Sequence, residues 1–330
     1  MGVIGDQRGR LKGVFFTLMR LAGRERSLYR RIRRVRPLII LNPHQVRPEP
    51  NPFWSPLHPR LFEELLSFVS KHFFVTTFGG FHTNDADRPS LIISFDDGYY
   101  DYVEHALPLL HEFRLPSNQN VIGESVVTGR PPAIVRVCDF LNQAPRSLVD
   151  ELDMPGFRDR LRGDGEREKT LYGVSLCNFL KARSRAESGP SWEIMERHMA
   201  RLDGFVPSRM MSVDEVRQAA CEHEIGAHSY SHESMEFETD DFFAEDFERC
   251  ATVFRDRLDL PLDTYAFPNG SYRPSQVDWL HTHGVAHVLL VGDGYALADE
   301  RTYKRFNYYA TSRGEARFRA LGYPARRSLA

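Results

Sequence analysis

Leu91-Ile92-Ile93-Ser94-Phe95-Asp96-Asp97-Gly98 is the stretch that decides the fold of this chain. The apolar run at its start follows Arg88-Pro89 and is typical of a buried strand, and two adjacent carboxylates and a glycine stand at its carboxyl end. Successive strand residues point to opposite faces, so Asp96 and Asp97 can serve one site only if the chain is already turning there. Gly98 supplies the backbone freedom for that turn.

A second segment, His228-Ser229-Tyr230-Ser231-His232, places two imidazoles four residues apart after the strand-like run Ile225-Gly226-Ala227. One carboxylate and two imidazoles form a three-ligand set for an ion of the Zn²⁺ type that keeps one position open for water. The remaining aspartate can act as a base on that water. Taken alone, each segment is more often a simple turn or a pair of surface histidines. Together, at the carboxyl ends of two strands, they predict a barrel site.

Ser-Phe-Asp-Asp-Gly-Tyr followed by His-Ser-Tyr-Ser-His resembles the first two motifs of the polysaccharide deacetylases, the NodB-homology group or carbohydrate esterase family 4. Residues 95–116 and 211–232 both read like segments of that family, and residues 265–272 resemble its third motif, Phe-x-Tyr/Phe-Pro-x-Gly. The resemblance begins near Leu38 and is interrupted by a poorly matching middle. It implies a metal-dependent deacetylase on a distorted (β/α) barrel.

The resemblance also implies a role for each motif residue. Asp96 corresponds to the general base, and Asp97, His228 and His232 correspond to the residues that hold a divalent ion, in most cases zinc. In this family a backbone N–H of the third motif helps to stabilise the oxyanion of the tetrahedral intermediate, and that position falls on Asn269. No organic cofactor is expected.

Two positions depart from the family pattern. The third-motif arginine that orients the catalytic aspartate is replaced by Ala266, as in a branch that includes enzymes acting on poly-N-acetylglucosamine. The late Leu-x-His motif, whose histidine protonates the leaving amine, is missing. In the arginine-lacking branch a Met-Tyr-His on the first strand supplies that acid, and the corresponding segment here is Leu41-Asn42-Pro43-His44. His44 is therefore the candidate acid. Alternatively, His44 is a strand-end histidine that only forms hydrogen bonds. His287 is the competing candidate for the acid.

Strand-like and helix-like runs alternate along the chain. The strand-like runs lie at residues 38–41, 73–77, 91–95, 225–228, 264–267 and 286–291. A further strand is expected near 120–123, and the segment 116–121 that leads into it is unusually polar. Helix-like runs include 59–71, 102–113, 213–222, 242–257 and 274–283. Alternation of this kind predicts a parallel α/β architecture, and the resemblance makes it a distorted (β/α) barrel of about seven strands.

The chain is expected to divide into a basic segment, 1–36, and one barrel domain, 37–330, since a barrel of this length is ordinary as a single domain. Residues 138–210 are a charged, helix-rich insertion expected beside the barrel mouth, and we interpret them as solvated in preference to a substrate lid. The basic segment carries eight arginines and one glutamate between Arg20 and Arg36. Its apolar run at 14–19 is too short to span a bilayer, and no Ala-x-Ala-like cleavage site follows.

The basic segment allows two interpretations. A basic amphipathic segment can lie on an anionic membrane face, and a solvated helix packed on the barrel is equally compatible with the pattern. Stacking aromatics are not interleaved with the arginines, apart from Tyr29, so nucleic-acid binding is not expected. The expected location is the cytoplasm, with peripheral contact at the inner membrane face.

Composition narrows the function further. The net charge of −2 argues against a general polyanion binder, and the four cysteines (Cys138, Cys177, Cys221 and Cys250) lack CxxC spacing and are expected to be reduced, buried side chains. The predicted function is metal-dependent removal of an N-acyl group, acetyl above all, from an amino sugar in a glycan or in a nucleotide-linked or lipid-linked sugar. Two alternatives remain open: a hydrolase of a non-sugar amide such as a ureide, and a pseudoenzyme that binds glycan without turnover.

Overall fold

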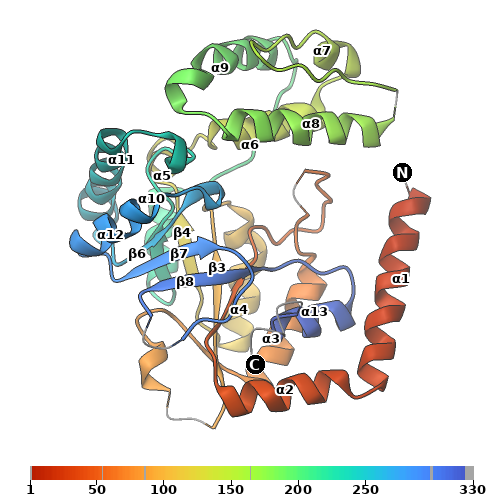
Figure 1. Ribbon diagram of the computed structural model, residues 1–330, viewed down its shortest axis with the longest axis vertical. Coiled ribbons are helices and arrows are strands. Elements are labelled where there is room, and N and C mark those ends of the chain that lie inside the picture. Colours follow the sequence, from red (N-terminus) through yellow and green to blue (C-terminus); the bar gives the residue numbers. More distant parts are fainter. Residues whose placement is uncertain (1, 54, 85–86, 164, 298–299, 324–330) are drawn as a thin grey trace.

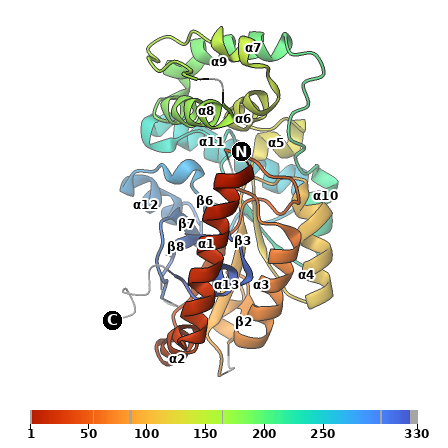
Figure 2. The same ribbon diagram turned by 90° about the vertical axis from the view of Figure 1, so that its right-hand side faces the viewer.

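A computed structural model describes residues 2–53, 55–84, 87–163, 165–297 and 300–323 (Figures 1 and 2). Parallel strands form its centre: β1 (Ile39–Asn42), β2 (Phe74–Thr76), β3 (Ser90–Phe95), β4 (Asn118–Val121), β5 (Glu224–Ala227), β6 (Thr264–Ala266), β7 (His287–Val291) and β8 (Thr302–Asn307). The pairing order is β1-β8-β7-β6-β5-β4-β3, and β1 also pairs with β3. Seven strands therefore close a barrel.

The strand β2 lies outside this ring and distorts it. Both β1 and β2 pair with Leu91 and Ile92 of β3, so they flank opposite sides of that strand. The strand β4 pairs with β3 only further along, at Ser94 and Phe95. The predicted distorted (β/α) barrel is thereby confirmed, and the polar run of the sequence is the strand β4.

Helices fill the connections between strands and cover the outside of the barrel (Figure 1). They are α3 (Pro59–His72), α4 (Leu107–Phe113), α5 (Gly123–Thr128), α10 (Val213–Ala220), α11 (Asp240–Thr252), α12 (Pro274–Thr282) and α13 (Arg313–Ala320). The π-helical turns η2 (Tyr102–Ala106) and η4 (Val253–Leu258) precede α4 and follow α11, and the 3₁₀ turns are η1 (Phe81–Thr83), η3 (Met235–Phe237) and η5 (Pro268–Gly270).

Strand alternation separates two hydrophobic cores and positions the polar centre. Leu91, Ile93 and Phe95 of β3 belong to the outer core under the helices, whereas Ile92 belongs to an inner core inside the barrel. The residues that follow Ile92 on the inward face are Ser94 and then Asp96. The barrel interior thus changes from apolar to polar toward the carboxyl ends of its strands.

Four helices form a separate layer above those carboxyl ends (Figure 1). They are α6 (Ala133–Gln143), α7 (Arg146–Asp150), α8 (Glu166–Lys181) and α9 (Arg185–Ala200). Their apolar faces bury a hydrophobic core of their own, with Phe140, Leu176 and Met195 among its buried members. We call this layer the cap. It begins at Ala133, five residues before the insertion expected from the sequence.

The strand β8 and the helix α13 were not predicted from the sequence, and no defined helices were predicted in residues 1–36. That segment forms α1 (Gly2–Leu21) and α2 (Arg24–Val35), joined at Gly23. None of the helices in the described part of the chain is long and apolar enough to cross a membrane. The four cysteines are free as expected, and Cys177 and Cys250 are buried. Cys138 is only half-buried, and Cys221 is exposed because it ends α10 on the outer surface.

Candidate active site

Three side chains of metal-ligand type converge at the carboxyl end of the barrel. Asp97 follows β3, and His228 and His232 follow β5. Oδ1 of Asp97 lies 3.3 Å from Nε2 of His228 and 3.2 Å from Nε2 of His232. The potential ligand atoms of all three residues lie within 4.8 Å of one another, and the residues are only 3–8% exposed. The structure thus brings together the three residues that the sequence assigns to the ion.

The donor set suits a divalent cation. Nδ1 of His228 lies 2.9 Å from the carbonyl oxygen of Ala266, an acceptor that orients the ring with Nε2 toward Asp97. One carboxylate and two imidazole nitrogens are the donor types that catalytic zinc takes, and they leave a position for water or substrate. The residues present therefore fit the group that the sequence predicts.

The backbone turns sharply at the residues of the site. Asp97, His232 and Asn269 have φ of 74°, 62° and 57°, a left-handed conformation that costs on the order of 1–3 kcal/mol for a non-glycine residue and persists only where its surroundings enforce it. At Gly98, φ is 77° and an added Cβ would lie 3.2 Å from Val121. Asp96 continues the inward face of β3, and the turn at Asp97 and Gly98 swings the second carboxylate toward the histidines. Adjacent aspartates thereby share one site.

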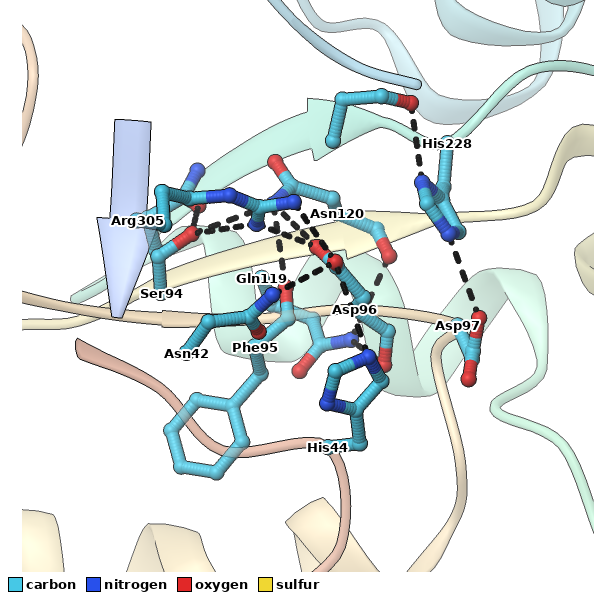
Figure 3. Close-up of polar contacts among 12 residues, drawn as sticks. Asn42, His44, Ser94, Phe95, Asp96, Asp97, Gln119, Asn120, His228 and Arg305 are labelled. Carbon is cyan, nitrogen blue, oxygen red and sulfur yellow. Dashed lines mark hydrogen bonds and ion pairs between the residues drawn. The ribbon is translucent and has the colours of Figure 1, made fainter. Parts of the chain in front are cut away.

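Asp96 is held by donors from three other strands (Figure 3). The guanidinium group of Arg305, on β8, donates to Oδ1 at 2.7 Å and to Oδ2 at 2.8 Å. Nδ2 of Asn120, on β4, donates to Oδ1 at 2.8 Å, and Nδ2 of Asn42, on β1, donates to Oδ2 at 3.0 Å. Each carboxylate oxygen thus accepts two hydrogen bonds, and the side chain has no freedom to reorient.

The charges of this network compensate one another. Arg305 is completely buried, and a buried charge of this kind is tolerated when it is paired and hydrogen-bonded. Burial by itself raises the pKa of Asp96, but Arg305 and His228 outweigh that effect and hold the pKa well below its usual value. Burial likewise raises the pKa of Asp97. Hydrogen bonds with His228 and His232 have the larger, opposite effect, so the pKa of Asp97 is well below its usual value. Both carboxylates are therefore ionised at neutral pH.

The structure separates the two histidines that competed for the role of acid. His44 follows β1, with Nε2 lying 4.0 Å from Oδ2 of Asp96. Burial lowers the pKa of His44 by more than Asp96 and Asp97 raise it, so the ring is mainly neutral at neutral pH. His287 is the first residue of β7, whereas Val291, at the other end of that strand, lines the site cavity. His287 therefore lies toward the opposite end of the barrel.

The site opens into a cavity of about 320 Å³ between the barrel and the cap. Asn269, the residue assigned to the oxyanion, lines it together with His44 and the two aspartates. The wall contributed by the cap consists of side chains from α6 and α8, including Ile134, Val135, Cys138, Asn178 and Lys181. The insertion therefore covers the candidate site, whereas the sequence favoured a solvated segment beside the barrel mouth.

The three donors to Asp96 were not predicted from the sequence. For Asn120 a signal existed, because residues 117–120 read as a strand that is unusually polar. Arg305 lies in Thr302-Tyr-Lys-Arg-Phe-Asn307, where Tyr303, Arg305 and Asn307 alternate along the strand, but two adjacent basic residues suggest an exposed edge. Arg305 supplies from β8 the guanidinium group that the third motif lacks at Ala266.

The fold and this site together define a class of barrel hydrolase. Its carboxyl edge combines a carboxylate clamped by arginine with an adjacent Asp–His–His ligand set. A family model described as polysaccharide deacetylase matches residues 191–288, a segment that includes His228, His232 and Asn269. The resemblance seen in the sequence is thereby confirmed: the protein is a hydrolase of the polysaccharide deacetylase type, which acts on non-peptide carbon–nitrogen bonds.

Solved structures show the same fold at low sequence identity. The deacetylase PplD of Streptococcus pyogenes, in complex with acetate, is 12% identical with a TM-score of 0.55, covering 86% of this chain and 98% of its own. IcaB from Ammonifex degensii is 16% identical with a TM-score of 0.54, covering 86% and 97%. BC0361, a polysaccharide deacetylase from Bacillus cereus, is 11% identical with a TM-score of 0.54, covering 86% and 69%. No curated protein sequence matches the chain.

Proposed function

We propose that the protein is a metal-dependent N-deacetylase of an amino sugar. The observation that carries the proposal is the convergence of Asp97, His228 and His232 beside the arginine-held carboxylate of Asp96. A divalent ion held by the first three residues, zinc being the one that suits them best, would lower the pKa of water toward 7 and polarise the acyl carbonyl. The remaining chemistry falls to the side chains around it.

Asp96 accepts a proton from the attacking water. Its four hydrogen bonds occupy both oxygens, so one of them has to be given up. The bond from the neutral amide of Asn42 to Oδ2 is the weaker one at that oxygen, because the bond from Arg305 is charge-assisted. Arg305 and Asn120 meanwhile keep the carboxylate in place. The low pKa of Asp96 makes it a weak base, suited only to a water more acidic than bulk water.

His44 and Asn269 complete the proposed mechanism. The mainly neutral imidazole of His44 must gain a proton before it can give one to the departing amine, and Oδ2 of Asp96, 4.0 Å from Nε2, is a near source. The backbone N–H of Asn269, in its left-handed turn, is proposed to donate to the developing oxyanion. Pro268 and Gly270 hold that turn on either side.

The cavity under the cap limits the size of the substrate that we propose. A cavity of about 320 Å³ is at the low end of the range for ligand sites, which is roughly 300–1,000 Å³. Such a roofed cavity suits one acylated sugar at the end of a chain or on a carrier better than the interior of a long polymer. Lys181, on the cap side, adds a positive charge that suits the phosphate of a nucleotide-linked or lipid-linked sugar.

Two rival functions make different predictions. A pseudoenzyme was suggested by Ala266, but Arg305 now provides the missing guanidinium contact to Asp96, which weakens that argument. A hydrolase of a non-sugar amide would share the catalytic centre and differ only in the substrates that it accepts.

The test combines metal content with amine release. Purified protein is assayed for bound metal and then for free amine from N-acetylglucosamine, its nucleotide and polyprenyl diphosphate conjugates, chitin oligomers and a ureide, with the Asp96→Asn variant as control. Release from a sugar substrate that the variant does not catalyse supports the proposal. Metal without turnover of any sugar or ureide indicates the pseudoenzyme, and release from the ureide alone indicates the non-sugar hydrolase.

A further inference from the structure

The helix α1 exposes a continuous apolar stripe. Its members are 48–75% exposed and recur at helical spacing: Leu11, Val14, Phe15, Leu18 and Leu21. At 100° per residue they occupy an arc of roughly 120° on one face of the helix. Scattered exposed apolar residues are normal on a protein surface, but an aligned stripe of five indicates an interaction site.

This stripe is not the face by which α1 packs on the rest of the protein. Phe16, on the other side of the helix, is buried, and its ring lies 5.5 Å from that of Phe318 and 5.7 Å from that of Tyr323, between ring centroids. A Cβ added to Gly314 of α13 would lie 3.0 Å from the Cβ of Phe16, so the helices meet closely. Figure 2 shows α1 running along the outside of the barrel with α2 at its foot.

The helix α2, which is joined to α1 at Gly23, presents positive charge. Ile32 of α2 is fully buried, and Leu28 and Tyr29 pack against the same core. The arginines of the helix point the other way and are exposed: Arg24, Arg26, Arg30, Arg31, Arg33 and Arg34. Arg20, in the last turn of α1, and Arg36, which follows α2, are exposed as well. Arg33 and Arg36 form ion pairs with Asp87. Eight arginines in this short segment still contrast with a net charge of −2 for the whole chain, so positive charge is concentrated here.

We propose that the stripe of α1 and the arginines of α2, together the N-terminal surface, bind an anionic phospholipid membrane. An apolar helix face inserts at the boundary between headgroups and acyl chains, and neighbouring arginines attract anionic headgroups. A second copy of this chain fits the surface less well, because pairing through α1 would bring two arginine clusters together. Nucleic acid would use the arginines but would leave the aliphatic stripe in water.

The N-terminal surface is independent of the catalytic proposal. Its residues do not line the cavity, and the surface would be retained if the barrel acted on a different amide. A carrier-linked substrate would nevertheless be presented at the same membrane.

The experiment measures partition of the full chain onto large unilamellar vesicles by co-sedimentation. Vesicles of phosphatidylglycerol and phosphatidylcholine are compared with vesicles of phosphatidylcholine alone, at low and high salt. Two double variants test the two parts of the surface: Phe15→Ser with Leu18→Ser, and Arg30→Glu with Arg34→Glu. Matched controls on the cap and in the segment that follows it are Leu171→Ser with Val206→Ser, and Arg167→Glu with Arg197→Glu, all at exposed positions.

We expect the wild type to bind anionic vesicles at least tenfold more strongly than neutral ones, and added salt should weaken this binding. Each α1 or α2 variant should lose at least tenfold in affinity for anionic vesicles, whereas the control variants should bind like the wild type. A Leu18→Trp variant should gain a blue-shifted emission with anionic vesicles, which shows that the stripe enters the lipid. Equal binding by variants and controls would overturn the proposal. So would a dimer that the Leu18→Ser change dissociates, or binding to duplex nucleic acid that is tighter than to the vesicles. Circular dichroism of every variant confirms that it is folded.

Discussion

The barrel centre and the cap line the same cavity but are built differently. Around Asp96, the side chains of Asn42, Asn120 and Arg305 are 0–1% exposed, and each donates to a defined carboxylate oxygen. The cap wall mixes apolar and polar side chains, and none of the hydrogen bonds to Asp96 described above comes from it. A preorganised hydrogen-bond network can fix the reacting groups in place, whereas a wall of mixed side chains can select which substrates enter the cavity. Under the proposed function, the barrel would therefore determine the reaction and the cap would determine access to it.

The largest expected effect comes from removing the ion. Chelation, or alanine at His228, should abolish deacetylation while the far-ultraviolet circular dichroism is unchanged, because the barrel core does not depend on the site. Activity should return when zinc is added to the chelated wild type and not to the variant. Full activity in metal-free protein would show that the barrel centre works without an ion.

Asp96→Asn should lower kcat by roughly 10²–10⁴-fold, the usual contribution of a positioned acid or base. The amide keeps the size of the carboxylate, so the variant should still bind metal at Asp97, His228 and His232. Metal stoichiometry and single-turnover rates provide the measurement. Near-normal turnover would remove Asp96 from the mechanism and leave His44 as the group to examine.

Arg305→Leu should destabilise the protein by about 3–5 kcal/mol, because it leaves the buried charge of Asp96 without its partner. The double variant Arg305→Leu with Asp96→Asn should recover much of that loss, since the uncompensated charge is gone. Urea unfolding of the wild type, both single variants and the double variant gives the coupling free energy. Additive effects would mean that the two residues do not depend on each other.

A change in the cap should affect binding more than chemistry. Lys181→Met is expected to raise KM for a phosphate-linked sugar about tenfold, the effect of losing roughly 1.5 kcal/mol from a charged hydrogen bond, with kcat little changed. KM for free N-acetylglucosamine should stay the same, and Lys71→Met, an exposed lysine on α3, is the control. A tenfold fall in kcat would instead assign the cap a part in catalysis.

The smallest effect is expected at the other end of the barrel, where a polar contact is structural. The backbone N–H of Ser117 donates to Nδ1 of His223 at 3.2 Å. Burial, followed by the nearby His111, lowers the pKa of His223 from 6.5 to about 4. The unfolded chain therefore binds the proton more readily, and the stability contributed by His223 is lost as pH falls from about 6.5 to about 4. His223→Asn should flatten the stability curve there without changing activity at pH 7.

Much of the site could be predicted because its motifs are local. Asp96 and Asp97 stand at the end of one apolar strand, and His228 and His232 stand at the end of another. The carboxyl ends of parallel strands meet at one edge of a barrel, so these residues had to come together if the strands paired in parallel. The predicted strand ranges agree with the observed strands to within a few residues for the same reason, because apolar runs and glycines mark the ends of strands locally.

Arg305 could not be predicted in that way. It lies 209 positions from Asp96, beside another basic residue, in a strand that the sequence analysis did not identify. Its burial depends on β8 closing the barrel between β7 and β1, which turns the inward side of that strand toward Asp96. The cap is a similar case, because its helices are readable from sequence but their position over the cavity is not.

The sequence by itself determined the strand-ending motifs, the parallel barrel, the chemical type of the ligand set and the concentration of arginine near the N-terminus. Each of these depends on neighbours within a few residues, where periodicity and side-chain chemistry operate. The tertiary structure alone decided which donors hold Asp96, which histidine lies near it and what covers the cavity. These are contacts between segments far apart in the chain, and only closure of the barrel and packing of the cap bring them within bonding distance.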